Sequence, residues 1–122
     1  MVPKILVIDD SGTSQIMARM LLASLEVSIE TAKDGVEGLE QAEKVRPDLI
    51  LLDIVMPRMD GFETCKQLRA RDATRETPIL IVTTRGEEAN VEKGFALGCT
   101  DYICKPFNAV ELLAKVKSYL RS

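Results

Sequence analysis

Hydrophobic residues along the chain fall into short runs separated by stretches with helical spacing. The runs are rich in β-branched residues and are bounded by Pro, Asp or Thr, which is typical of buried strands. The central runs are continuously apolar rather than alternating, as expected for strands that helices cover on both faces. The predicted strands are residues 4–8, 27–31, 48–53, 79–83 and 102–104.

Between these runs, apolar residues recur every three or four positions, which is the spacing of one helical face. The first helix is expected to turn Ile16, Met20 and Leu21 towards the core. Gly98 is placed to end the fourth helix, and Asn108 is placed to cap the fifth. The predicted helices are residues 11–25, 35–45, 62–71, 87–97 and 109–120.

Strands that alternate with helices predict right-handed crossovers and therefore a parallel sheet covered on both faces. No internal repeat, linker or low-complexity tract interrupts the pattern, so one domain over residues 1–122 is expected. A doubly wound α/β domain of this kind, with five strands and five helices, binds ligands outside the carboxyl ends of its strands, near the point where the strand order reverses.

Polar side chains stand at the ends of most of the predicted strands. The first strand ends in Asp9 and Asp10, the third in Asp53, the fourth in Thr83 and Thr84, and the fifth in Lys105. The second strand ends in Thr31 and Ala32, which offer little chemistry. The polar ends converge if the second strand lies at an edge, which predicts the order 2-1-3-4-5. Each residue alone is more often a turn, cap or solvated residue, so the candidate site rests on the whole set.

Three carboxylates brought together repel one another, and a divalent cation relieves that repulsion. Hard oxygen ligands that leave room for water suit Mg²⁺, with Mn²⁺ as the alternative. An aspartate can also act as a nucleophile and form an aspartyl phosphate, while a lysine and a metal neutralise the transferred oxygens. The set therefore predicts metal-dependent phosphoryl transfer to a carboxylate.

Composition narrows the class of protein. The chain has 122 residues, 46% hydrophobic and 29% charged, and a net charge of −3, which suits a globular domain and argues against direct contact with nucleic acid or a membrane surface. No apolar run approaches the roughly 20 residues that cross a bilayer, and the first residues lack the pattern of a signal peptide, so a cytoplasmic location is expected. The three cysteines form no CxxC pair and are expected to be reduced.

In order and separation, these residues resemble the receiver domain of bacterial two-component response regulators, of the CheY type. The resemblance covers essentially the whole chain. Its motifs are Asp9-Asp10, the segment Asp53-x-x-Met56-Pro57-x-Met59-Asp60-Gly61, the strand end Val82-Thr83, and Lys105-Pro106-Phe107. The resemblance implies a flavodoxin-like fold and a phosphorylation-controlled signalling switch rather than an enzyme with a separate substrate.

The resemblance also implies how the site is divided among residues. Asp53 would be the phosphoacceptor, and Lys105 would pair with the phosphoryl group. Besides Asp53, the metal would be held by Asp10 directly, by Asp9 directly or through water, and by the backbone carbonyl of Val55. Because this chain contains no histidine, the phosphodonor would be a sensor histidine kinase or a separate phosphotransfer protein.

Two further residues are implied in switching. Thr83 matches the hydroxyl that moves towards the phosphoryl group, and Tyr102 matches the aromatic residue that then turns inward. Together they would alter the face formed by the fourth helix, fifth strand and last helix, where an unidentified effector would bind. The Lys105-Pro106 peptide bond would be cis. The chain would be a monomer or a phosphorylation-dependent dimer.

Three positions depart from the family pattern. Thr84 stands where a small residue is usual, Val55 replaces a polar residue that orients attacking water, and Arg85 replaces an acid. An apolar side chain cannot position water, so we expect a long-lived phosphoryl group. Val55 and Arg85 are therefore the expected lifetime-tuning residues.

Two other classes of protein share parts of this pattern. A Mg²⁺-dependent phosphatase with an aspartyl phosphate typically has a second acid where this chain has Val55, and it carries a cap insertion for which 122 residues leave no room. A flavin carrier would place a phosphate near the turn Asp9-Asp10-Ser11-Gly12, whose acidity opposes an anion. Both are less favoured than a receiver domain.

Overall fold

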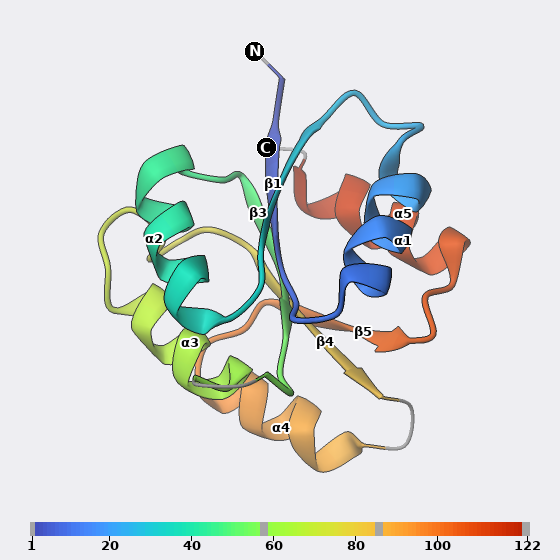
Figure 1. Ribbon diagram of the computed structural model, residues 1–122. Helices are drawn as coiled ribbons and strands as arrows, with labels where there is room; N and C mark the ends of the chain where they lie inside the picture. Colours follow the sequence, from blue (N-terminus) through green and yellow to red (C-terminus); the bar gives the residue numbers. More distant parts are fainter. Residues whose placement is uncertain (1, 57–58, 85–86, 121–122) are drawn as a thin grey trace.

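The computed structural model describes residues 2–56, 59–84 and 87–120. Within them lies one five-stranded parallel sheet in the order β2-β1-β3-β4-β5, with helices on both faces, so the predicted fold is confirmed (Figure 1). The strands are β1 (Lys4–Ile8), β2 (Ser28–Ala32), β3 (Leu49–Asp53), β4 (Ile79–Thr84) and β5 (Asp101–Lys105). The helices are α1 (Gly12–Leu22), α2 (Gly35–Val45), α3 (Gly61–Arg69), α4 (Glu88–Ala96) and α5 (Ala109–Leu120).

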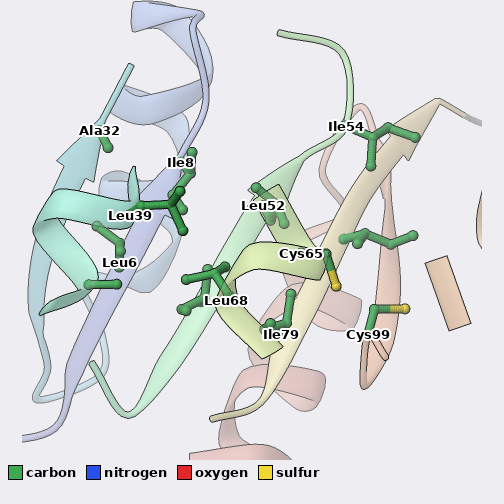
Figure 2. Packing of buried hydrophobic residues seen from close by; sticks show 13 residues of the cluster. Leu6, Ile8, Ala32, Leu39, Leu52, Ile54, Cys65, Leu68, Ile79 and Cys99 are labelled. Carbon is green, nitrogen blue, oxygen red and sulfur yellow. The ribbon is translucent and has the colours of Figure 1, made fainter. Parts of the chain in front are cut away.

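Two core layers lie on opposite faces of the sheet. Alternate residues of one strand enter different layers, because successive side chains of a strand point to opposite faces. Thus Leu6 and Ile8 of β1 pack in the layer that contains Leu68 of α3, which Figure 2 shows, whereas Ile5 and Val7 pack in the layer that contains Val116 of α5. Helices α1 and α5 cover one face, and α2, α3 and α4 cover the other (Figure 1).

The predicted inner face of the first helix is wrong. In α1 the buried residues are Ala18 and Leu22, while Ile16 is 59% exposed and Met20 is 70% exposed. Leu21 is only partly buried against the core. Apolar residues occupy more than one side of this helix, so spacing alone did not select a face. Ala18 and Leu22 pack in the core layer that contains Val116 of α5. An apolar surface on α1 therefore faces solvent.

The other helices follow the pattern closely. Cys65 and Leu68, three residues apart on one face of α3, are buried. Gly98 has a φ of 102°, so it ends α4 in the left-handed conformation that glycine favours. Asn108 caps α5 by accepting a hydrogen bond from the Glu111 N–H at 3.0 Å. Among the described residues, no helix is long and apolar enough to cross a membrane.

The cysteines are free thiols, as expected. Cys65 and Cys99 are buried, and Cys104 is partly exposed on β5. Burial raises the pKa of the Cys99 thiol to about 11 and also raises that of Cys65. Both thiols are therefore packing groups of the core layer in Figure 2 rather than reactive ones.

Candidate functional site

Three carboxylates meet beyond the ends of β1 and β3. One oxygen each from Asp9, Asp10 and Asp53 lies within 4.8 Å of the others. Asp9 and Asp53 are buried, with 2% and 7% exposure, whereas Asp10 is open to solvent. Hard oxygen ligands with one side open to water are the donor set that fits Mg²⁺.

Lys105 supplies the positive charge at this site. Its Nζ lies 3.0 Å from Asp9 Oδ2 and 3.6 Å from Asp53 Oδ2. The lysine is the last residue of β5, and the peptide bond that joins it to Pro106 is cis. Because β4 separates β5 from β3, the lysine side chain reaches across a strand end to join acids from two other strands.

The turn after β1 fixes the acid pair. The backbone N–H of Ser11 donates to Asp9 Oδ1 at 2.9 Å, while the hydroxyl of Ser11 caps α1 by accepting from the Ser14 N–H at 3.2 Å. Ser11 alone therefore serves as the N-cap. This leaves the Asp10 carboxylate available to the site.

The ionised form of Asp53 is disfavoured in this site. Its pKa is raised from 3.8 to about 6, mainly by burial and then by the neighbouring charge of Asp9. Lys105 and the backbone N–H of Val55, which donates to Asp53 Oδ1 at 3.3 Å, act in the opposite direction. A cation or an electrophile placed beside Asp53 would relieve this charge.

The Asp60-Gly61 pair closes the loop after β3 back onto the strand. Asp60 caps α3 by accepting from the Glu63 N–H, and the Gly61 N–H donates to the Ile54 carbonyl at 3.0 Å. A Cβ on Gly61 would collide with the backbone of Asp53 and Ile54, so only glycine fits this approach. Pro57 of the same segment lies outside the described residues.

A cavity of about 320 Å³ opens beside the acids. Its lining includes Asp10, Asp53, Val55, Thr83, Thr84, Glu87, Asn90 and Lys105. Thr83 is 3% exposed, and its Oγ1 has no hydrogen-bond partner among the described residues. An unpaired buried hydroxyl is costly, so this group is ready to pair with an acceptor that enters the cavity.

Two of the three positions that depart from the family pattern, Val55 and Thr84, line the same cavity. The side chain of Val55 is 74% exposed at the mouth. Thr84 is exposed and lines the cavity. Arg85 falls outside the described residues. Sequence reasoning missed Glu87 and Asn90, which border the cavity from the start of α4; their place just after the strand end Thr83-Thr84 was the available signal.

The structure does not bring Tyr102 into this cavity. Its side chain packs against the core layer of Figure 2, and it pairs in register with Ile81, two residues before Thr83. The Nζ of Lys115 lies 4.4 Å from the centre of the tyrosine ring. Tyr102 is therefore a neighbour of the site along the sheet, while Asp9, Asp10, Asp53, Thr83 and Lys105 form the site itself.

Comparison with known proteins agrees with this geometry. The family model for the response regulator receiver domain matches residues 5–117. Over 118 residues, the chain is 43% identical to the transcriptional regulatory protein ResD of Bacillus subtilis (strain 168), which covers 97% of this chain and 48% of ResD. The chain spans about half the length of the curated relatives it matches.

Two solved structures are similar over the whole chain. The chemotaxis protein CheY4 of Vibrio cholerae has a TM-score of 0.91 and 37% identity, covering 98% of this chain and 99% of that one. The receiver domain of the sensor histidine kinase PA1611 from Pseudomonas aeruginosa PAO1 has a TM-score of 0.90 and 29% identity, covering 100% of both chains. That receiver domain has a magnesium ion coordinated in its active-site cleft.

Proposed function

The chain belongs to the response regulator receiver domain family, and we propose that Asp53 accepts a phosphoryl group in a Mg²⁺-dependent reaction. The observation that carries the proposal is the set of groups around one cavity. A buried carboxylate with a raised pKa lies beside two further acids and a lysine, and a buried threonine hydroxyl with no partner among the described residues lines the same cavity. These are the groups that a carboxylate nucleophile and a transferred phosphoryl group need.

In the proposed step, a carboxylate oxygen of Asp53 attacks the phosphorus of a phosphohistidine on a donor protein. A P–O bond forms to Asp53, and the P–N bond of the donor breaks. The electron pair of that bond leaves with the imidazole, which takes a proton from solvent. Lys105 is placed to pair with the arriving oxygens, because it already lies within 3.6 Å of Asp53.

Asp9, Asp10 and Asp53 would hold the cation, and the proposal gives the backbone carbonyl of Val55 a further place in the ligand set. When bound, Mg²⁺ supplies positive charge for the transferring oxygens. Asp10 is the exposed member, so it can reach the ion without first breaking a buried contact. Asp9 is already engaged by Lys105 and Ser11, which favours a contact through water.

Phosphorylation would act through Thr83. A phosphoryl group adds about −1.5 to −2 charge and strong acceptor oxygens, and the Thr83 hydroxyl lacks a described partner. A shift of Thr83 would change the packing beside β5, where Tyr102 lies two residues along the sheet. The result would be a population shift at the face of α4, β5 and α5, where an effector would bind.

The same function implies a phosphodonor protein and a single-domain organisation. A sensor histidine kinase or phosphotransfer protein would be the donor, and the exposed Ile16, Met17 and Met20 of α1 offer it an apolar contact on the helix that follows the acid pair. Residues 1–122 would form one receiver domain, a switch rather than an enzyme with a separate substrate. It would work in the cytoplasm, as a monomer or a phosphorylation-dependent dimer, without direct contact to nucleic acid or membrane.

The proposal is tested by incubating the protein with acetyl phosphate and measuring its intact mass. One phosphoryl group should be added when Mg²⁺ is present and none when EDTA replaces it. Asp53→Asn should abolish the addition, while Asp60→Asn, which changes an acid outside the site, should retain it. A protein that remains unmodified with Mg²⁺, or that is modified equally without it, would refute the proposal.

A further inference from the structure

Gln15 lies behind the acid pair rather than in the cavity. Its Nε2 donates to the backbone carbonyl of Asp9 at 2.7 Å and to that of Ala32 at 3.3 Å. Both neighbours are carbonyl oxygens, which can only accept, so the amide must turn its nitrogen towards them. Gln15 thus ties the turn after β1 to the end of β2.

These side-chain hydrogen bonds continue the connection between β1 and β2 beyond the last backbone hydrogen bond. The register pairs of β1 and β2 end with Ile8 and Ala32, and the Asp9 N–H then donates to the Ala32 carbonyl at 2.9 Å. The Asp9 carbonyl comes after the last of these pairs. Gln15 supplies the donor that this carbonyl would otherwise need from water.

Asp9 is thereby held at four points. Its N–H bonds to Ala32, its carbonyl accepts from Gln15, and its carboxylate oxygens accept from the Ser11 N–H at 2.9 Å and the Lys105 ammonium at 3.0 Å. Gln15 differs from Ser11 and Lys105 because the hydrogen bonds described for its side chain reach backbone carbonyls and not a carboxylate. It fixes the backbone from which the Asp9 and Asp10 side chains leave.

We propose that Gln15 is a positioning residue for the cation site, which sets the directions of the Asp9 and Asp10 carboxylates. This inference rests on the proposed function, in which those acids bind Mg²⁺. Groups behind a metal ligand typically control affinity by about 10–100-fold, because they orient the ligand before the ion arrives. A residue that only stabilised the fold would change melting temperature without changing metal affinity.

The test is isothermal titration calorimetry of the purified protein with MgCl₂. The melting temperature of the metal-free protein is measured on the same samples. Gln15→Met keeps the length of the side chain but removes the donor, and Gln15→Asn keeps the amide but shortens its reach. Both should raise the Mg²⁺ dissociation constant by about tenfold. Thr13→Ala, a change of an exposed residue in the same turn, should leave it unchanged.

The outcomes are separable. Weaker Mg²⁺ binding in both Gln15 variants, with parent-like binding in Thr13→Ala, supports the inference. An unchanged dissociation constant in either folded Gln15 variant, even with a lower melting temperature, overturns it and leaves the proposed function standing. A parent protein that binds no Mg²⁺ overturns the proposed function and this inference together.

Discussion

The ammonium of Lys105 lies 3.0 Å from a carboxylate oxygen of Asp9. Its distance to Asp53 is longer, at 3.6 Å, so the proposed nucleophile is the less well compensated of the two buried acids. Burial, followed by the charge of Asp9, accordingly keeps the pKa of Asp53 raised to about 6 despite the lysine. A cation bound beside Asp53 would therefore stabilise the ionised carboxylate.

This raised pKa predicts a pH-dependent stability in the metal-free protein. The pKa of Asp53 is about 6 in the folded protein and 3.8 ordinarily. The stability that protonated Asp53 contributes to the folded state is therefore fully present below pH 3.8 and is lost as the pH rises through 6. Asp53→Asn avoids that loss, so the variant should exceed the parent by about 3 kcal/mol in free energy of unfolding at pH 8. Urea denaturation in EDTA measures the difference, which should close as the pH falls towards 4. Equal stability of the two proteins at pH 8 would contradict the electrostatic account.

Gly61 can be tested for its role in the loop after β3, with Gly12 of α1 as the matched control. Gly61→Ala places a methyl group against the backbone of Asp53 and Ile54, which cannot yield without moving the acceptor. We expect a loss of about 2 kcal/mol in stability, as for other overpacked sites, together with weaker Mg²⁺ binding. Gly12→Ala meets no atom within 4 Å and should leave both unchanged or slightly improved. Thermal melts and Mg²⁺ titration would show whether the two variants differ in this way.

Val55 is expected to lengthen the lifetime of the phosphoryl group. Its side chain is 74% exposed at the cavity mouth and cannot hydrogen-bond a water for attack on phosphorus. Val55→Asn should therefore speed dephosphorylation several-fold, measured as phosphate release after the donor is removed. Val55→Ala, which is also apolar, serves as the control and should release phosphate like the parent. An asparagine variant with the parent's lifetime would remove this role from Val55.

The apolar surface of α1 predicts a difference between protein and small-molecule donors. Met20→Glu places a charge on a residue that is 70% exposed and is not one of the residues that line the cavity or form the acid cluster, so phosphorylation by acetyl phosphate should not change. Transfer from a cognate histidine kinase should slow by about tenfold, the effect of losing one interface contact of about 1.4 kcal/mol. Val2→Glu, at an exposed apolar residue of the amino-terminal segment, should transfer normally. Equal slowing with both donors would mean that Met20 acts on the site and not on docking.

The topology could be predicted from sequence because the central strands are continuously apolar and the polar groups stand at their ends. The site followed from the same pattern: Asp9, Asp10, Asp53, Thr83 and Lys105 meet around one cavity edge, as their places after β1, β3, β4 and β5 required. Their number and order carried the prediction, since each residue alone fits a turn or a cap.

Other features depended on three-dimensional packing that no spacing rule contains. The inner face of α1 is formed by Ala18 and Leu22, and the more hydrophobic Ile16 and Met20 remain outside. The spacing pattern assigned no role to Gln15, whereas in the structure its amide reaches two backbone carbonyls. The preference of Lys105 for Asp9 over Asp53 depends on differences of less than an ångström in side-chain position.

The most direct test of the central claim is to identify the residue that carries the phosphoryl group. The protein is phosphorylated with acetyl phosphate and Mg²⁺ and then treated with borohydride, which reduces an aspartyl phosphate to homoserine. Peptide mass spectrometry then locates the reduced residue. The account predicts homoserine at position 53 and unmodified aspartate at positions 9 and 10. Homoserine at Asp9 or Asp10, or its absence from all three positions in protein shown to be phosphorylated, would contradict it.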